Sequence, residues 1–572
     1  MSSNKADKIT NSEVGAIHKN WSGRLSIALV YPNLYSVGMS NLGFLSVYQL
    51  LNNFDDVVCE RAFLPEINTE GKVHEIEPVK TIESKKSLAE FDIVAFSISF
   101  ENDFPNMLTI IQNSGIPLQS YARGGSHPLL IAGGVACFLN PEPVADFIDC
   151  FLIGEGESLF EPFFNHLDLS LSKETCLLKL AQNVPGAYVP IFYKPEYNQD
   201  GSLKSFETTV DVPKKIKRVF LTDLSNVPTF SSVVSPEAAF DSSWLIEVSR
   251  GCPHGCRFCS AGYVYRPPRF RDTKFLQQCF VQGSSVSKKI GLVGTAISDH
   301  PEIGKICTGF DNKDVRFSFS SLRADALSEE HINVLKKSDV KTATIAPDAG
   351  SERMRAVINK GITKEHVLNA TQRLVKADIP NLKIYLMVGL PSETNDDIDE
   401  TIEFCKEIKE VFLEASREKG RIGHITISVN PFVPKPFTPF QWAPMEKVNI
   451  LKKKINKIKN GLRRVPNMTV NADSPREAYI QALFSKGDRR VSELLTEAVQ
   501  NNWNWKDIYK KSTLDTDFYV HKDRPFSELF PWDFIEHGVN KAFLENEYKR
   551  SLKNKTSPPC PITNCSLCGV CK

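Results

Sequence analysis

Three cysteines within eight residues constrain this chain more than any other feature. They lie in the segment Cys252-Pro-His-Gly-Cys256-Arg-Phe-Cys259, shortly after the apolar run at residues 245–249. Thiolates are the usual protein ligands of iron–sulfur clusters, and three of them can hold three irons of a cubane while the fourth iron stays open. Zinc is the main alternative, but zinc knuckles usually consist of two paired C-x2-C units, and no second pair lies nearby. A [4Fe-4S] cluster is therefore the favoured interpretation.

The composition excludes several other classes of protein. With 572 residues the chain is long enough for three or four domains, and 41% hydrophobic with 24% charged residues is typical of a globular protein. The net charge of +1 does not favour any particular polyanionic partner. The polar opening MSSNKADKITNSE is unlike a signal peptide, and no apolar run approaches the ~18 residues of a membrane span. The clustering of the 14 cysteines favours a reducing, cytoplasmic location with metal sites.

Four apolar runs in the N-terminal third predict buried strands, which alternate with helices. They cover residues 25–31, 91–100, 128–132 and 150–154. Such alternation predicts an α/β fold with a Rossmann-like, doubly wound sheet, whose ligand crevice lies beyond the carboxyl ends of the strands. The residues at those ends could contact a ligand, or they could serve only as turn residues. They are Ser97, Ser99, Glu101, Gly133, Gly134, Gly154 and Glu155.

Six further strand–helix units begin at residue 245. The expected strands are LIEVS, KKIGLVGTA, VRFSFSSLR, TATIAPDAG, NLKIYLMVGLP and HITISVNPF. Six such units predict a partial (β/α)6 barrel, in which catalytic groups lie at the carboxyl ends of the strands. The three-cysteine loop follows the first of these strands.

The C-x3-C-x2-C loop, with Phe258 before its last cysteine, resembles the signature of the radical S-adenosylmethionine (SAM) superfamily. The resemblance implies that Cys252, Cys256 and Cys259 hold a catalytic [4Fe-4S] cluster whose open iron binds SAM. Reductive cleavage of SAM would then give a 5′-deoxyadenosyl radical. Motifs at other strand ends resemble those that hold SAM in this family. The implied cofactor-binding residues are Phe258, Gly294, Thr295, Ser321, Arg323, Asp348 and Gly389.

Two of these positions leave alternatives open. Gly294-Thr295 lacks the acidic residue of the family's Gly-Gly-Glu motif, so backbone carbonyl groups would have to bind the methionine amino group. Arg323 suits the methionine carboxylate, because an Arg fork matches a carboxylate bidentately, but it could also form a surface ion pair.

The N-terminal part resembles the cobalamin-binding-type domain that precedes many radical SAM enzymes. The segment GGVACFLNPEPVADFIDCFLIGEGE carries this resemblance, which implies a cobalamin crevice beside Ser97, Gly133, Gly134, Gly154 and Glu155. The chain lacks the Asp-x-His-x-x-Gly motif that supplies a histidine to cobalt. Either cobalamin binds without a protein imidazole, or the domain has kept its shape and lost the cofactor.

The C-terminal part is expected to be helical and to end in a second metal site. Apolar residues recur every three or four positions from residue 448, and the basic face opposite them is a solvated surface or, alternatively, a patch for RNA. The final C-x4-C-x2-C-x2-C spacing indicates a second iron–sulfur cluster or a structural zinc ion. Its ligands would be Cys560, Cys565, Cys568 and Cys571.

These features predict six segments. They are a flexible tail at 1–20, a cobalamin-binding-like Rossmann domain at 21–170, a connector at 171–235, the radical SAM barrel at 236–445, a helical domain at 446–555 and a cysteine-rich tail at 556–572. Most of the chain resembles a family of uncharacterised fused radical SAM proteins. The proline-rich stretch at 430–442 resembles methylthiotransferases and cobalamin-dependent radical methylases, and its prolines predict a stiff loop over the barrel mouth.

The resemblance implies a radical SAM enzyme in the cytoplasm, with a flavodoxin or ferredoxin as reductant. If cobalamin binds, the expected reaction is methylation of an unactivated carbon. Without cobalamin, a methylthiotransferase-like or other radical modification of RNA, a peptide or a small molecule is open. A hypothesis of another class is a non-catalytic protein that binds metal and nucleic acid through the cysteine tail and the basic helix. The sequence does not identify the substrate.

Overall fold

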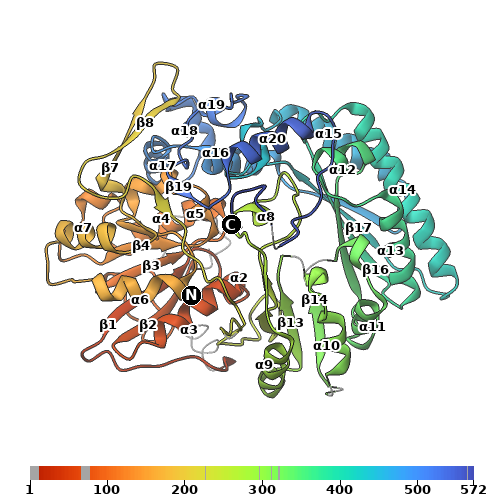
Figure 1. Cartoon of the computed structure of the whole chain (residues 1–572), viewed down its shortest axis with the longest axis horizontal. Coiled ribbons are helices and arrows are strands. Elements are labelled where there is room, and N and C mark those ends of the chain that lie inside the picture. The colour runs from red at the N-terminus through yellow and green to blue at the C-terminus, as the bar shows by residue number, and fades with distance from the viewer. Residues whose placement is uncertain are drawn as a thin grey trace.

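Two α/β halves lie side by side, and the C-terminal helices lie across one end of both (Figure 1). The computed structural model describes residues 12–65, 78–225, 227–295, 297–310, 312, 314–319, 322–562 and 565–571. The N-terminal half is drawn in red to orange, and the second half in green to cyan. This arrangement confirms the predicted α/β class. Within the described ranges, no helix has the length and apolar character needed to cross a membrane.

The N-terminal half is built on a six-stranded sheet with the order β2-β1-β3-β4-β5-β6. The first five strands run parallel and β6 is antiparallel. Strand order reverses between β1 and β3, which is where doubly wound sheets open a ligand crevice. The strands are β1 (Leu25–Tyr31), β2 (Val57–Phe63), β3 (Ile93–Ser97), β4 (Leu129–Gly133), β5 (Cys150–Leu152) and β6 (Ala187–Tyr188).

Strand β6 carries the sheet beyond the predicted domain end at residue 170, to Tyr188. The prediction of a flexible tail is wrong for residues 12–20. The backbone of Val14 pairs with that of Val234, and the backbone N–H of Ile17 donates to the Tyr48 hydroxyl. Residues 1–11 lie outside the described ranges. The helices of this half are α2 (Tyr35–Gly38), α3 (Leu42–Asn52), α4 (Phe104–Asn113), α5 (Val135–Leu139), α6 (Gly156–His166) and α7 (Lys173–Asn183).

The second half is an open barrel of seven parallel strands, one more than predicted. A parallel bridge from Leu322 to Ile345 links its two sheets, β10-β13-β14 and β15-β16-β17-β18. The extra strand, β18, lies in the segment predicted to be helical. Its short sequence MTVNA offers too little apolar periodicity to indicate a strand. The strands are β10 (Trp244–Glu247), β13 (Lys289–Val293), β14 (Arg316–Phe319), β15 (Thr342–Asp348), β16 (Asn381–Val388), β17 (Ile425–Pro431) and β18 (Met468–Ala472).

Helices cover the outside of this barrel (Figure 1). They are α9 (Thr273–Val286), α10 (Ile303–Gly309), α11 (Glu329–Lys337), α12 (Glu352–Val357), α13 (Lys364–Lys376), α14 (Asn395–Arg417) and α15 (Val448–Leu462). The basic face of α15 is smaller than the sequence implies, because buried Lys454 pairs with Glu393 and Lys457 pairs with Asp399. Five basic residues on α15 and just beyond its end remain exposed: Lys452, Lys453, Lys459, Arg463 and Arg464.

Ion pairs tie the first half to the C-terminal region and to the proline-rich stretch of the barrel half. Buried Glu142 of the first half receives two hydrogen bonds from Arg489, and Glu101 receives one of 2.6 Å from Lys435 of the proline-rich stretch.

The connector forms a hairpin, β7 (Tyr193–Tyr197) with β8 (Leu203–Thr208), and β9 (Ile216–Lys217) pairs with β19 (Ile535–Glu536). The C-terminal helices are α16 (Pro475–Lys486), α17 (Val491–Gln500), α18 (Trp505–Lys511), α19 (Thr516–Val520) and α20 (Lys541–Ser551).

Candidate active site

The three-cysteine loop connects the two strands of a short antiparallel hairpin at the end of the first barrel strand. This hairpin pairs β11 (Ser249–Arg250) with β12 (Arg269–Phe270) and closes the loop at both ends. Gly251 opens the loop with φ +85, and a Cβ there would lie 2.6 Å from the Tyr265 carbonyl oxygen, so only glycine fits. A short helix, α8 (Ala261–Val264), follows the last cysteine. We call residues 251–268 the cluster loop.

The three thiols lie close enough to influence one another. Cys256 is buried, whereas Cys252 and Cys259 are half-buried. Burial, together with the neighbouring Cys256, raises the pKa of Cys252 to about 12 and that of Cys259 to about 11. The metal-free thiols therefore hold their protons at neutral pH and release them when metal binds.

This donor set fits a cubane. No three Cys, His, Asp or Glu side chains in the described ranges converge on a single metal ion. A cubane does not require such convergence, because each cysteine binds a different iron atom.

Two cations lie beside Cys256. Burial raises the pKa of this thiol, while Lys360 and Arg323 act in the opposite direction and favour the thiolate. Lys360 Nζ lies 2.5 Å from Asp348 Oδ2, and Arg323 forms an ion pair of 2.8 Å with Asp325 and donates to the Lys360 carbonyl. The predicted cofactor residues Arg323 and Asp348 thus lie near the cluster loop, but their charged groups already have protein partners.

The back of the cluster loop is tied to α12 and to the C-terminal segment. Arg257 is fully buried and donates to the carbonyl groups of Val357 (2.9 Å) and Lys555 (2.7 Å), as well as to the Glu547 carboxylate. Asn359 donates to the Gly255 carbonyl and accepts from the Ser557 backbone, so it joins the loop to the tail. These contacts hold the middle of the loop, where Cys256 lies.

The C-terminal cysteines lie against the same loop. The Cys560 backbone N–H donates to the carbonyl of Pro253, one residue after Cys252, at 2.7 Å. The Asn540 backbone N–H donates to the carbonyl of buried Cys568. Burial raises the pKa of Cys571, and its neighbours Cys560, Cys568 and Cys565 add to the shift. The four tail thiols therefore gather within electrostatic reach of one another, beside the cluster loop.

A cavity of about 540 Å³ opens between the two halves. It extends from the middle of β1 and the carboxyl ends of β3, β4 and β5, under α3 and α6, to the ends of β10 and β13 in the barrel. Its walls are mostly apolar. Seven of the predicted cofactor residues line this cavity, five from the first half and two from the barrel: Ser97, Gly133, Gly134, Gly154, Glu155, Gly294 and Thr295.

Two serines in the cavity wall have buried hydroxyl groups that find no hydrogen-bond partner among the described residues. They are Ser46 of α3 and Ser249 of β11, from opposite sides of the cavity. A buried polar group without a partner is costly and calls for an explanation, which a bound ligand would supply. Neither serine is predicted from the sequence. For Ser249 the available signal is its place at a strand end, beside the Arg250-Gly251-Cys252 turn.

Two other predicted cofactor residues, Phe258 and Gly389, lie elsewhere. Phe258 packs against an apolar cluster that includes buried Trp442 and Phe440. Gly389 donates its N–H to Glu393, and a Cβ there would lie 2.5 Å from a Leu451 methyl group of α15, so it is a turn glycine under a helix. Neither residue lines the cavity. Ser321 lies outside the described residues.

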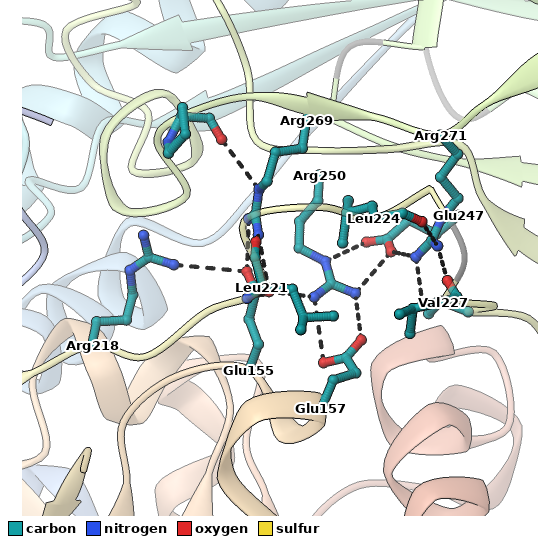
Figure 2. Close-up of polar contacts among 12 residues, drawn as sticks. Glu155, Glu157, Arg218, Leu221, Leu224, Val227, Glu247, Arg250, Arg269 and Arg271 are labelled. Atoms are coloured by element: carbon teal, nitrogen blue, oxygen red, sulfur yellow. Dashed lines mark hydrogen bonds and ion pairs between the residues drawn. The ribbon is translucent and has the colours of Figure 1, made fainter. Parts of the chain in front are cut away.

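Glu155 lines the cavity, yet both of its carboxylate oxygens bind arginines of the barrel (Figure 2). Arg250 Nη1 lies 2.7 Å from Oε2, and Arg269 Nη2 lies 2.7 Å from Oε1. Burial alone would raise the pKa of Glu155, but the hydrogen bonds from Arg269 and the charge of Arg250 bring it below the usual value. Glu155 is therefore ionised and fully paired before any cofactor enters.

Comparison with known proteins agrees with this architecture. The family profile described as radical SAM proteins, N-terminal, matches residues 43–190, and the one described as the radical SAM superfamily matches residues 246–405. An uncharacterised protein of Methanocaldococcus jannaschii is 30% identical over 474 residues, which cover 82% of this chain and 90% of that protein. The chain belongs to the radical SAM superfamily. The predicted family is thus confirmed, and membership implies a [4Fe-4S] cluster and SAM.

More distant similarities are partial. A tRNA-2-methylthio-N(6)-dimethylallyladenosine synthase of Desulforamulus reducens is 24% identical over 178 residues, 29% of this chain and 39% of that enzyme. Two solved structures are similar at low TM-scores. The cobalamin-dependent radical enzyme OxsB gives 0.41 at 15% identity, over 67% of this chain and 51% of that one. The methyltransferase TsrM of Kitasatospora setae gives 0.42 at 11% identity, over 85% and 98%.

Proposed function

We propose that this radical SAM protein is a methyltransferase that binds cobalamin in the cavity between its two halves. The cavity itself is the observation that supports the proposal. It joins the carboxyl ends of the Rossmann-like strands to the strand ends beside the cluster loop, so one bound group would reach from the first half to the SAM site. A methyl donor and a radical generator have to meet at one substrate, and this cavity offers a common space.

The cavity has features that suit a corrinoid. Doubly wound sheets with the order 2-1-3-4-5 bind their cofactor where strand order reverses, and the cavity lies there. It also continues as an apolar slot between the sheet and helices α3 and α6, with Leu51 and Phe160 in its walls, which suits a flat aromatic group. No histidine occurs among its described lining residues, so cobalt would bind without a protein imidazole.

The barrel side of the cavity suits SAM. Ser249 offers its unpartnered hydroxyl, and Gly294 lies so close that a Cβ there would be 2.7 Å from the Ser249 oxygen. The missing side chain keeps space open for a ligand beside that hydroxyl. When bound, the [4Fe-4S] cluster supplies the electron that cleaves SAM, and cobalamin supplies the methyl group. The chain's own residues orient the two cofactors and exclude water, since the cavity walls are mostly apolar.

The tail cysteines fit a second iron–sulfur cluster that passes electrons to the catalytic one. Its four thiols would leave no open iron, and the hydrogen bond from Cys560 to Pro253 connects it directly to the catalytic loop. Cys560, Cys565 and Cys571 are half-buried, and Leu567 is 73% exposed, so a reductant protein such as a flavodoxin or ferredoxin could reach this end.

The methylthiotransferase similarity supports the alternative, in which the tail centre takes part in sulfur transfer to RNA. The corrinoid content separates the two proposals. We expect the full-length protein, incubated anaerobically with hydroxocobalamin and then desalted, to retain about one cobalt per chain. Gly133→Leu fills the cavity and should abolish retention, whereas Gly124→Leu, at an exposed position with no heavy atom within 4 Å of its Cβ, should not. Equal and negligible cobalt in all three proteins would refute the methyltransferase proposal.

A further inference from the structure

Seven charged side chains form one buried network where the two halves meet the cluster loop (Figure 2). Glutamates come from the β5–α6 junction and from the end of β10, while arginines come from the connector and from the β11–β12 hairpin. The network holds one more positive than negative charge. Its members are Glu155, Glu157, Glu247, Arg218, Arg250, Arg269 and Arg271.

Glu155 has a special place in this network because it holds the cluster loop at both ends. Arg250 lies just before the loop and Arg269 just after it, and the two are directly paired across the β11–β12 hairpin. One oxygen of Glu155 lies 2.7 Å from Arg250 and the other 2.7 Å from Arg269. A single carboxylate of the Rossmann-like half therefore clamps the base of the loop that carries all three catalytic cysteines.

The remaining contacts show that Arg269 depends on this acid more than Arg250 does. Arg250 also binds Glu157 and Glu247, but Arg269 has Glu155 as its only acidic partner among the described residues and otherwise reaches backbone carbonyls, such as that of Leu221. Loss of the Glu155 charge would leave Arg269 without its acidic partner, while Arg250 keeps Glu157 and Glu247. The base of the loop would then be held less firmly on the Arg269 side, although Arg257 and Asn359 still hold its middle.

We infer that Glu155 is a positioning residue, through which the Rossmann-like half sets the geometry of the cluster loop for SAM cleavage. The same carboxylate lines the cavity together with Arg250 and Gly251, so a group bound there touches the clamp itself. Filling of the cavity is thereby coupled to the arrangement of the catalytic cysteines. The inference depends on the radical SAM chemistry of the family and not on methylation or cobalamin.

The test compares Glu155→Gln with a matched buried interdomain acid that does not touch the loop. Glu142 is buried in the same half and receives two bonds of 3.1 Å from Arg489, so Glu142→Gln removes a similar ion pair elsewhere. Full-length proteins are reconstituted anaerobically with iron and sulfide. We measure iron content, KM and kcat for 5′-deoxyadenosine formation from SAM with dithionite, and the electron paramagnetic resonance (EPR) spectrum of the reduced cluster with and without SAM.

We expect Glu155→Gln to keep the iron content of the wild type, to raise the KM for SAM at least tenfold with kcat within threefold, and to weaken the spectral change that SAM causes. Glu142→Gln should resemble the wild type in all three. If Glu155→Gln matches the wild type in KM and spectrum, or if Glu142→Gln shifts them equally, the inference is overturned. Should Glu155→Gln fail to fold, the double variant Glu155→Gln/Arg218→Met, which keeps the network's net charge, is judged by the same criteria. Corrinoid retention is measured separately, so failure of the methyltransferase proposal is distinguishable.

Discussion

Gly134→Ala offers a sharp test of the crevice geometry. Gly134 follows β4 with φ 101 and ψ 169, a conformation that is nearly restricted to glycine and costs other residues about 1–3 kcal/mol. An added Cβ would lie 2.4 Å from the Ile98 carbonyl oxygen and 2.9 Å from the Ile98 nitrogen. Such overlap with backbone forces a shift that costs about 1–3 kcal/mol more. We therefore expect a loss of about 2–6 kcal/mol in the free energy of unfolding of the N-terminal half.

Gly133→Ala is the matched control, since Gly133 is adjacent and lines the same cavity. Its φ is ordinary, and the nearest atom to an added Cβ is the Leu152 carbonyl oxygen at 3.5 Å, a normal contact. Its stability should stay within about 1 kcal/mol of the wild type. Thermal unfolding measures the difference, and we expect the Gly134→Ala midpoint to fall by on the order of 10 °C. Equal midpoints for the two variants would refute the geometry at the end of β4.

Three further predictions concern other parts of the chain. Burial, with some help from Arg524, lowers the pKa of Lys486 to about 7. At this position the unfolded chain therefore binds more protons between pH 7 and 10.5, so Lys486 makes stability rise with pH in this window. Lys486→Met should reduce the difference between thermal midpoints at pH 7 and pH 9, and an unchanged slope would contradict the assignment. Lys435→Met removes the cationic partner of buried Glu101 and leaves its carboxylate the hydrogen bond from Gln481. The loss should cost about 3–5 kcal/mol in urea unfolding at pH 8 and be partly restored by adding Glu101→Gln; no loss would contradict the pair. Cys568→Ala should remove about four of the eight irons of the wild type. The variant should keep SAM cleavage driven by dithionite and lose SAM cleavage driven by flavodoxin. One zinc ion in place of four irons at the wild-type tail would contradict the tail proposal.

The sequence anticipates the features that depend on local patterns. The cysteine spacing, the apolar strands and the glycines at strand ends all follow from residues close together in the chain, and the cavity collects Ser97, Gly133 and Gly294 as strand-end reasoning predicts. Strand β2 was not anticipated, because Glu60 and Arg61 interrupt its apolar run. In the fold, Thr81 and Glu83 satisfy these two side chains.

The roles of charged residues escape this kind of reasoning. Glu155 lies at a strand end and is predicted from the sequence to bind a cofactor, but its partner Arg269 lies 114 residues further along the chain. Only the docking of the two halves brings them together. The unpartnered hydroxyls of Ser46 and Ser249 are likewise visible only once the cavity exists, since serine is unremarkable in a helix or at a strand end.

The central claim is that Cys252, Cys256 and Cys259 hold a cluster that cleaves SAM. The direct measurement is 5′-deoxyadenosine formed by anaerobically reconstituted protein with dithionite and SAM. We expect product from the wild type and none from Cys256→Ala, whose remaining iron belongs to the tail. Equal product from both proteins, or no product from wild type with a full complement of iron, would contradict the account.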